Sequence, residues 1–140
     1  MRQKLNLITL GVKDLHESAR FFEEGLGWTR SDKSVEGLIL YPLGGMVLSL
    51  HPRQELAEDA TVADEPTGFS GITLSINTKS EAEADAILEE VRAAGGTIVK
   101  PAQKVYWGGY SGYFKDPSGH LFEVAYNPFW PLDEEDNLAV

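Results

Sequence analysis

The strongest constraint on the fold of this chain is an internal repeat of a strand followed by a helix. Residues 8–12 (ITLGV) recur 64 positions later as residues 72–76 (ITLSI), and both segments are short, alternating and rich in β-branched side chains. A helix signal follows each of them, because Asp14 and Ser80 are candidate N-caps with a glutamate three residues further on. The repeat indicates that one supersecondary unit occurs twice.

Three short strand candidates follow each expected helix. Turn-forming residues join the last two strands of each half, at residues 42–45 (PLGG) and 116–119 (DPSG). The candidates are residues 28–31, 37–41 and 46–51 in the first half and 97–100, 109–115 and 120–126 in the second.

This order predicts an α+β fold of tandem β-α-β-β-β modules that form a cupped mixed sheet. The 140 residues are the usual size of one domain, so we expect a single domain over residues 1–140. Its expected parts are module one at about 4–51, a linker at 52–67, module two at about 68–127 and a tail at 128–140.

Composition excludes several classes of function. Cysteine is absent, which excludes disulfides, thiolate metal sites and cysteine nucleophiles. The net charge of −10 opposes binding to nucleic acid or to anionic membranes. No long apolar run is present, so we expect neither a signal peptide nor a membrane span, and a cytoplasmic location.

The two faces of the expected sheet differ in character. Alternation places large aliphatic residues on one face of each strand, where the two amphipathic helices should pack. The other face mixes small, hydroxylic and charged groups with apolar ones, which is typical of a lined pocket. A second core or a dimer surface is the alternative. The mixed face carries Thr9, Ser49, His51, Thr73 and Glu123.

Four motifs give the chain a resemblance to a known family. Residues 12–15 (VKDL), 18–22 (SARFF) and 25–28 (GLGW) lie in the first half, and residues 114–123 (FKDPSGHLFE) lie in the second. With the doubled module, they make the chain similar to the vicinal-oxygen-chelate superfamily. That superfamily includes glyoxalase I, extradiol dioxygenases, fosfomycin-resistance enzymes and bleomycin-resistance proteins. The resemblance covers nearly the whole chain and implies the fold more strongly than any one reaction.

The resemblance also implies four metal-ligand positions, one on the first and one on the last strand of each module. Here they map to Leu7, Ser49, Gly71 and Glu123. The first and third have no side-chain donor, and a serine is a poor ligand for a divalent cation. A zinc site takes three or four protein ligands. We therefore expect no tightly held metal and no cofactor, and leave open a weak site formed by Glu123 with His51.

Glu123 remains open to two interpretations. A carboxylate among apolar neighbours is costly unless it has hydrogen-bond partners. One interpretation is a residue that binds or deprotonates a ligand, with its pKa raised by desolvation. The other is a relic carboxylate that Thr9, Thr73 or water satisfies, or that is paired with a nearby base.

Residues 105–113 (VYWGGYSGY) form the most unusual stretch of the chain. Glycines permit tight turns and close approach to a ligand, and aromatic rings supply stacking area. We expect this loop and strand to overhang the pocket, with Trp107, Tyr110 and Tyr113 against the ligand. A hydrophobic plug or a dimer contact is the alternative.

The sequence thus favours a protein of the bleomycin-resistance kind, which binds a small aromatic or planar ligand without a tightly held metal. A homodimer is implied by the resemblance. A metal-independent lyase or isomerase using Glu123, and a divalent-metal glyoxalase-like or dioxygenase-like enzyme, are the alternatives, so enzymatic activity is left open. The candidate ligand-binding residues are Thr9, Ser49, His51, Thr73, Trp107, Tyr110, Tyr113 and Glu123.

Overall fold

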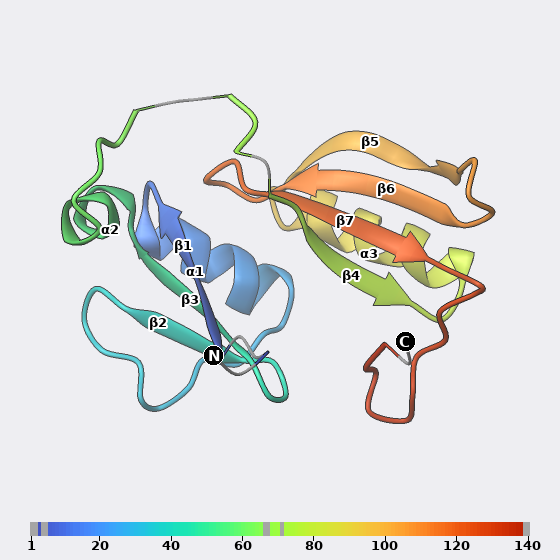
Figure 1. Cartoon of the computed structure of the whole chain (residues 1–140), viewed down its shortest axis with the longest axis horizontal. Helices are drawn as coiled ribbons and strands as arrows, with labels where there is room; N and C mark the ends of the chain where they lie inside the picture. The colour runs from blue at the N-terminus through green and yellow to red at the C-terminus, as the bar shows by residue number, and fades with distance from the viewer. Residues whose placement is uncertain (1–2, 4–5, 66–67, 71, 139–140) are drawn as a thin grey trace. The chain divides into compact units, whose positions relative to one another are not determined.

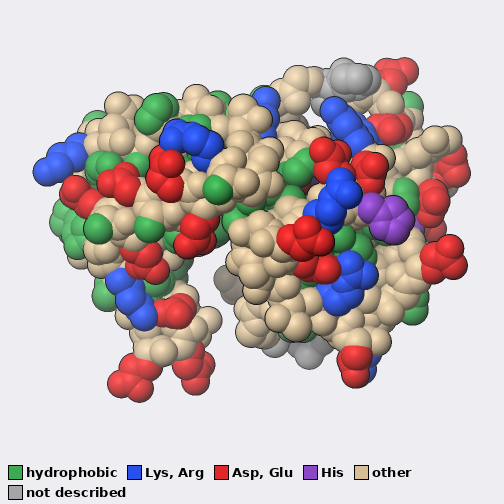
Figure 2. Space-filling view, turned by 180° about the vertical axis from the view of Figure 1, so that it is seen from behind, with side chains coloured by type: hydrophobic (Ala, Val, Ile, Leu, Met, Phe, Trp, Pro, Cys, Tyr) green, Lys and Arg blue, Asp and Glu red, His purple; other side chains and the backbone are tan. Residues whose placement is uncertain are grey.

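The chain divides into two compact units in a computed structural model that describes residue 3 and residues 6–65, 68–70 and 72–138. The units are Met1–Ser70 and Gly71–Val140, and each has its own sheet (Figure 1). The single domain and the module bounds expected from the sequence stay predictions. No helix in the described ranges is long and apolar enough to cross a membrane. Acidic side chains are spread over the visible face in Figure 2, interspersed with lysine and arginine.

The first unit has a three-stranded mixed sheet in the order β1-β3-β2. Strand β1 runs parallel to β3, and β2 runs antiparallel to it. One face of the sheet buries the aliphatic residues of β1 and β3 that alternation predicted, among them Val12, Leu48 and Leu50. The elements in chain order are β1 (Leu7–Val12), α1 (Leu15–Arg20), the π-helical turn η1 (Phe21–Gly25), β2 (Ile39–Pro42), β3 (Val47–Pro52) and α2 (Arg53–Asp59).

The strand predicted at residues 28–31 is wrong, so the first module is β-α-β-β. Only the Ser31 amide reaches across to β2, where it donates to the carbonyl of Leu40 at 2.8 Å. The ring of Trp28 packs instead against Phe22, with centroids 5.0 Å apart, and against Tyr41 at 5.7 Å. This segment therefore contributes an aromatic ring to the core and no strand to the sheet.

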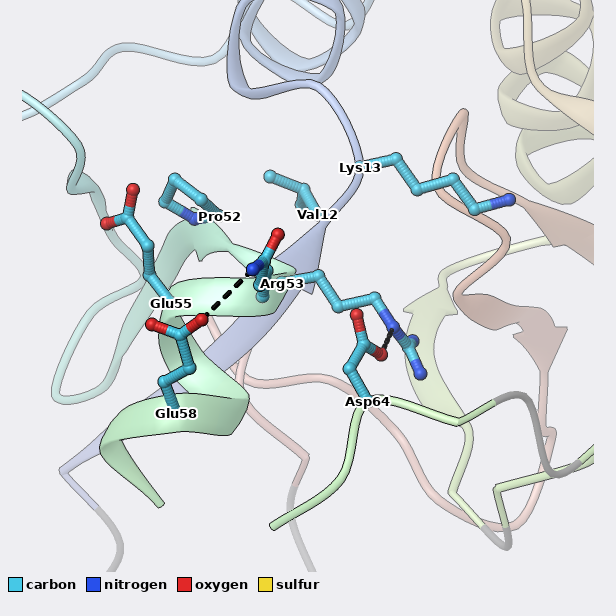
Figure 3. Close-up of a pocket in the computed structure, with 8 residues that line it drawn as sticks. Val12, Lys13, Pro52, Arg53, Glu55, Glu58 and Asp64 are labelled. Carbon is cyan, nitrogen blue, oxygen red and sulfur yellow. Dashed lines mark hydrogen bonds and ion pairs between the residues drawn. The ribbon is translucent and has the colours of Figure 1, made fainter. Parts of the chain in front are cut away.

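The helix α2 lies where the sequence predicted only a linker. It begins directly after Pro52, the last residue of β3, which has no amide hydrogen to donate to a ladder bond. The helix approaches β1 at Gly11, where an added Cβ would lie 3.2 Å from the Cα of Arg53. Arg53, the first residue of α2, forms an ion pair with Asp64, which lies beyond the end of the helix (Figure 3). The predicted linker is therefore structured over its first half.

The second unit has the complete β-α-β-β-β order that the sequence predicted. Its sheet runs β4-β7-β6-β5, with β4 parallel to β7 and the other pairs antiparallel. Helix α3 covers one face (Figure 1), where Phe114 and Phe122 stack with centroids 4.9 Å apart. The elements are β4 (Leu74–Thr78), α3 (Glu81–Ala93), β5 (Thr97–Lys104), β6 (Tyr110–Lys115) and β7 (Leu121–Tyr126).

Equivalent positions at the start of the two units differ by 66 in residue number, and not by the 64 that the sequence repeat suggested. The predicted N-caps are confirmed: Asp14 accepts a hydrogen bond from the amide three residues on at 2.9 Å, and Ser80 does the same at 3.1 Å. These caps are 66 residues apart, and β4 begins at Leu74 instead of at residue 72.

Strand pairing gives the same correspondence. Thr9 lies opposite Ser49 in the first unit, and Ser75 lies opposite Glu123 in the second. The counterpart of Leu7 is then Thr73, while Gly71, which the sequence comparison assigned to that position, lies outside the described residues.

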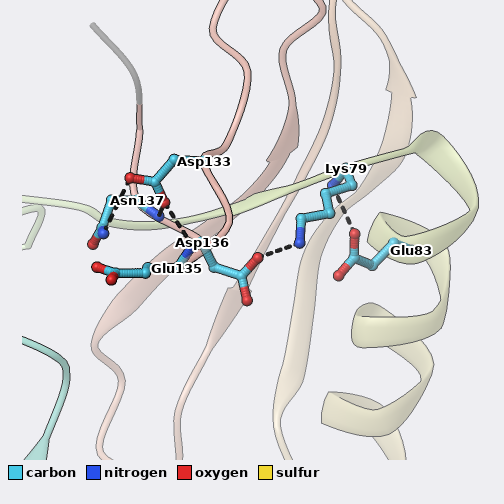
Figure 4. Close-up of polar contacts among 6 residues, drawn as sticks. All are labelled: Lys79, Glu83, Asp133, Glu135, Asp136 and Asn137. Carbon is cyan, nitrogen blue, oxygen red and sulfur yellow. Dashed lines mark hydrogen bonds and ion pairs between the residues drawn. The ribbon is translucent and has the colours of Figure 1, made fainter.

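The C-terminal segment is anchored to the start of α3 (Figure 4). The carboxylate of Asp133 accepts hydrogen bonds from the amides of Glu135 and Asn137, both at 2.9 Å. Hydrogen bonding to these amides lowers the pKa of Asp133. Asp136 forms an ion pair with Lys79, which raises the pKa of that lysine. The predicted tail therefore follows a defined path at least to residue 138.

Candidate functional site

The face of the second sheet opposite α3 carries a row of polar side chains, one from each strand. Ser75 of β4 lies opposite Glu123 of β7, Glu123 lies opposite Tyr113 of β6, and Tyr113 lies opposite Lys100 of β5. Directly opposed residues share a face of the sheet, so the four side chains form one line across it. We call these four residues the polar row.

Glu123 accepts a hydrogen bond at each of its carboxylate oxygens. Ser75 Oγ donates to Oε2 and the Tyr113 hydroxyl donates to Oε1, both at 3.1 Å. Burial and this hydrogen bond raise the pKa of Tyr113, so its phenol remains a protonated donor at neutral pH. The partners of Glu123 in the described part of its unit are therefore Ser75 and Tyr113, its neighbours in the same sheet.

Lys100 completes the polar row at the sheet edge. Its ammonium nitrogen lies 6.0 Å from the centre of the Tyr113 ring, at the outer limit of a cation–π contact. The row therefore presents a cation, a phenol, a carboxylate and a hydroxyl in sequence.

Two predicted residues meet in the first unit, where they satisfy each other. Ser49 is fully buried, and its hydroxyl donates to Thr9 Oγ1 at 2.7 Å. Two residues along β3, His51 Nδ1 lies 2.7 Å from the carbonyl oxygen of Gly37. Because a carbonyl only accepts, Nδ1 carries the proton and the other ring nitrogen, Nε2, is left without one in the neutral imidazole.

The aromatic segment contributes only Tyr113 to the polar row. The Tyr110 hydroxyl donates to Asp85 of α3 at 2.7 Å, so its side chain points to the helix side of the sheet. The indole of Trp107 lies against its own loop, where a Cβ added at Gly109 would be 1.7 Å from a ring carbon. Thr73 is exposed just before the first residue of β4.

Sequence reasoning missed two members of the polar row, Ser75 and Lys100. Alternation alone places Ser75 on the same face as Thr73, so a signal for it existed. Lys100 had no local signal, because its place depends on irregular pairing: the β5–β6 register shifts on both sides of it.

A separate pocket of about 530 Å³ lies in the first unit, between α2 and the ends of β1 and β3 (Figure 3). None of the residues predicted from the sequence lines it. Its walls are mostly charged or polar, and the Arg53–Asp64 ion pair occupies one side. The lining residues are Val12, Lys13, Pro52, Arg53, Gln54, Glu55, Glu58 and Asp64.

Comparison with known proteins identifies the family. The model of the Glyoxalase/Bleomycin resistance protein/Dioxygenase superfamily matches residues 4–124. The chain belongs to this superfamily. It is 32% identical over 124 residues to "Glutathione transferase FosA" of Serratia marcescens, a match covering 89% of this chain and 81% of that protein.

Solved structures of the superfamily agree with this assignment. A glyoxalase-related enzyme from Fulvimarina pelagi is 37% identical, with a TM-score of 0.90 and 99% of both chains covered. A lactoylglutathione lyase from Agrobacterium tumefaciens is 21% identical, with a TM-score of 0.68 and coverage of 94% of this chain and 98% of that one. The second likeness shows the fold alone.

The metal that the superfamily resemblance implies does not fit the residues present. Leu7 is apolar, the Ser49 hydroxyl is engaged with Thr9, and both oxygens of Glu123 already accept hydroxyl hydrogen bonds. Among the described residues, no group of three or more His, Cys, Asp or Glu side chains is placed to hold a metal ion. Among the described residues, the polar row offers a hydrogen-bonded carboxylate, a group that can accept further hydrogen bonds or a proton.

Proposed function

We propose that this protein binds a small aromatic or planar ligand on the face of the second sheet opposite α3, without a tightly held metal. The observation that carries the proposal is the carboxylate of Glu123, held at the middle of the polar row by hydroxyls from both neighbouring strands. Hydrogen bonds to an ionised acceptor are stronger than neutral ones, so the carboxylate is fixed in orientation before a ligand arrives.

The hydrogen-bonding capacity of the polar row indicates what the ligand presents to it. A carboxylate has about four acceptor positions, and Ser75 and Tyr113 use two of them. The remaining positions are suited to N–H or O–H groups of a ligand. The Tyr113 ring adds a flat apolar surface beside them, which suits an aromatic or planar compound.

We predict that Glu123→Gln weakens ligand binding at least about tenfold, because a hydrogen bond to a charged group contributes about 1.5–3 kcal/mol. The variant keeps the size of the side chain, removes its charge and replaces one acceptor oxygen by a donating NH2 group. Planar aromatic compounds and α-keto or hydroxy acids would be screened by thermal shift, since a ligand that binds only the folded state raises the melting temperature. Calorimetric titration of the best compounds then gives the affinities.

The matched control is Glu24→Gln, which removes one exposed carboxylate from the first unit and should leave affinity unchanged. Wild-type affinity in Glu123→Gln would remove Glu123 from the site. Stoichiometric zinc, nickel, iron or manganese in the purified protein would contradict the metal-free part of the proposal.

A second candidate is an enzyme in which Glu123 moves a proton, as a metal-independent lyase or isomerase would require. The 32% identity to a protein named as a glutathione transferase supports this enzymatic candidate. Incubating each screened compound with the protein and following it by proton NMR separates the two candidates. Turnover that Glu123→Gln abolishes, with binding retained, would favour the enzyme over the binding protein.

We also propose a homodimer and a cytoplasmic location, in line with the sequence resemblance. Light scattering of the purified protein should give a mass near twice 15.4 kDa. A mass near 15.4 kDa at micromolar concentration would contradict the dimer.

A further inference from the structure

Lys100 differs from the other basic residues that the structure describes. It alone is partly shielded from solvent, whereas every other described lysine and arginine is exposed. Arg30, Arg53 and Lys79 each form an ion pair with a carboxylate. No ion pair of Lys100 is found within the described ranges, and its ammonium lies over the Tyr113 ring instead. A partly desolvated cation without a counter-ion is unfavourable in free energy, and a bound anion would offset that cost.

The backbone around Lys100 is fixed by close contact between β5 and β6. The register between these strands shifts between Ile98 and Lys100 and again between Lys100 and Gln103, so β5 bulges on both sides of the lysine. Gly112 makes this possible, because a Cβ there would lie 2.8 Å from the Lys100 carbonyl oxygen and from the Ala102 nitrogen. The irregular pairing of β5 with β6 therefore determines the position of Lys100 in the polar row.

Lys100 and Glu123 lie two strands apart on the same face, with Tyr113 between them. Neighbouring strands are about 4.8 Å apart, so the two backbone positions are separated by about 10 Å. Opposite charges at the two ends of a flat aromatic surface suit a molecule with the complementary arrangement.

We propose that the polar row selects a dipolar ligand with a carboxylate that contacts Lys100 and a hydrogen-bond-donating amine or amide, about 10 Å away, that contacts Glu123. This inference rests on the proposed function and narrows it to peptide-like compounds. An extended tripeptide has this span, since each residue adds at most about 3.3–3.6 Å. Its middle residue would lie near Tyr113, between the two charged groups.

The test uses the full-length protein and the tripeptide glycyl-tyrosyl-glycine, with two modified forms. The C-terminal amide lacks the carboxylate and the N-acetyl form lacks the ammonium. Affinities are measured by calorimetric titration for wild-type protein and for Lys100→Gln and Glu123→Gln. Lys104→Gln is the matched control, because it removes the same charge from the same strand at a position that pairs with Tyr110, on the helix side of the sheet.

We expect Lys100→Gln to weaken binding of the free tripeptide about tenfold and to leave binding of its amide unchanged. Glu123→Gln should weaken binding of the peptides with a free amine more than that of the N-acetyl form. Equal wild-type affinity for the acid and the amide, or an equal loss in Lys104→Gln, would overturn the inference.

Failure of all three peptides to bind would also overturn it. If uncharged planar compounds still bind in a manner that depends on Glu123, the proposed function stands and only the dipolar ligand class fails. Loss of Glu123-dependent binding for every compound would instead remove the proposed function itself.

Discussion

Replacing Phe22 by alanine should lower the free energy of unfolding of the first unit by about 3–5 kcal/mol, the usual cost of removing a buried phenylalanine ring. Phe22 is 1% exposed, and its ring centroid lies 5.1 Å from that of Phe21, 5.0 Å from Trp28 and 5.6 Å from Tyr41. Aromatic pairs of this kind add to the free energy of burial. Since folded domains have free energies of unfolding of only about 5–15 kcal/mol, the substitution should remove a large part of the unit's stability.

Urea unfolding followed by tryptophan fluorescence measures this loss. A background with Trp107→Phe and Trp130→Phe leaves Trp28, which contacts Phe22, as the reporter. Phe69→Ala is the control, because that ring is 69% exposed and its removal should cost little. A loss below about 1 kcal/mol in Phe22→Ala would show that the ring is not part of a packed core.

Gly112→Ala should destabilise the second unit by about 1–3 kcal/mol, the cost of forcing extra atoms into a packed region. The added Cβ would lie 2.8 Å from a leucine methyl on α3 and at the same distance from two backbone atoms of β5. The leucine methyl is the end of a flexible side chain, but the backbone atoms move only if β5 separates from β6. The substitution should therefore also weaken the preference for an acidic ligand end, because Lys100 is carried by the displaced strand.

The two effects of Gly112→Ala have separate measurements. Thermal unfolding reports stability, and the ratio of affinities for the tripeptide acid and amide reports the position of Lys100. Gln103→Ala, at an exposed residue of β5, is the control for any change in that strand. Unchanged stability together with an unchanged affinity ratio would mean that β5 accommodates the methyl group without moving.

The sequence predicted the faces of the strands better than their register. The first strands of the modules are related by 66 positions, and the sequence repeat suggested 64. A shift of two residues returns every side chain of a strand to the same face, so Glu123 was still assigned correctly to the face opposite α3. The shift did change which residue lies opposite it, and for that reason Ser75 was missed.

Tyr110 and Tyr113 show that part of the error was avoidable. Residues three apart on a regular strand point to opposite faces, so the two rings could not both line one site. The structure places one hydroxyl on Asp85 and the other on Glu123. Trp28 and Lys100 were beyond local reasoning, because the first depends on tertiary packing with Tyr41 and the second on bulges in β5.

Ser49 and Glu123 occupy the same position in two copies of one module, opposite Thr9 and Ser75 respectively. In the first copy the Ser49 hydroxyl donates to Thr9, and in the second the Glu123 carboxylate accepts hydrogen bonds from both neighbouring strands. Duplication thus allows one position to carry a neutral hydroxyl in one copy and a carboxylate in the other. Under selection for folding alone, small residues should be interchangeable at position 49. Position 123 should tolerate substitution freely only in the absence of selection for ligand binding.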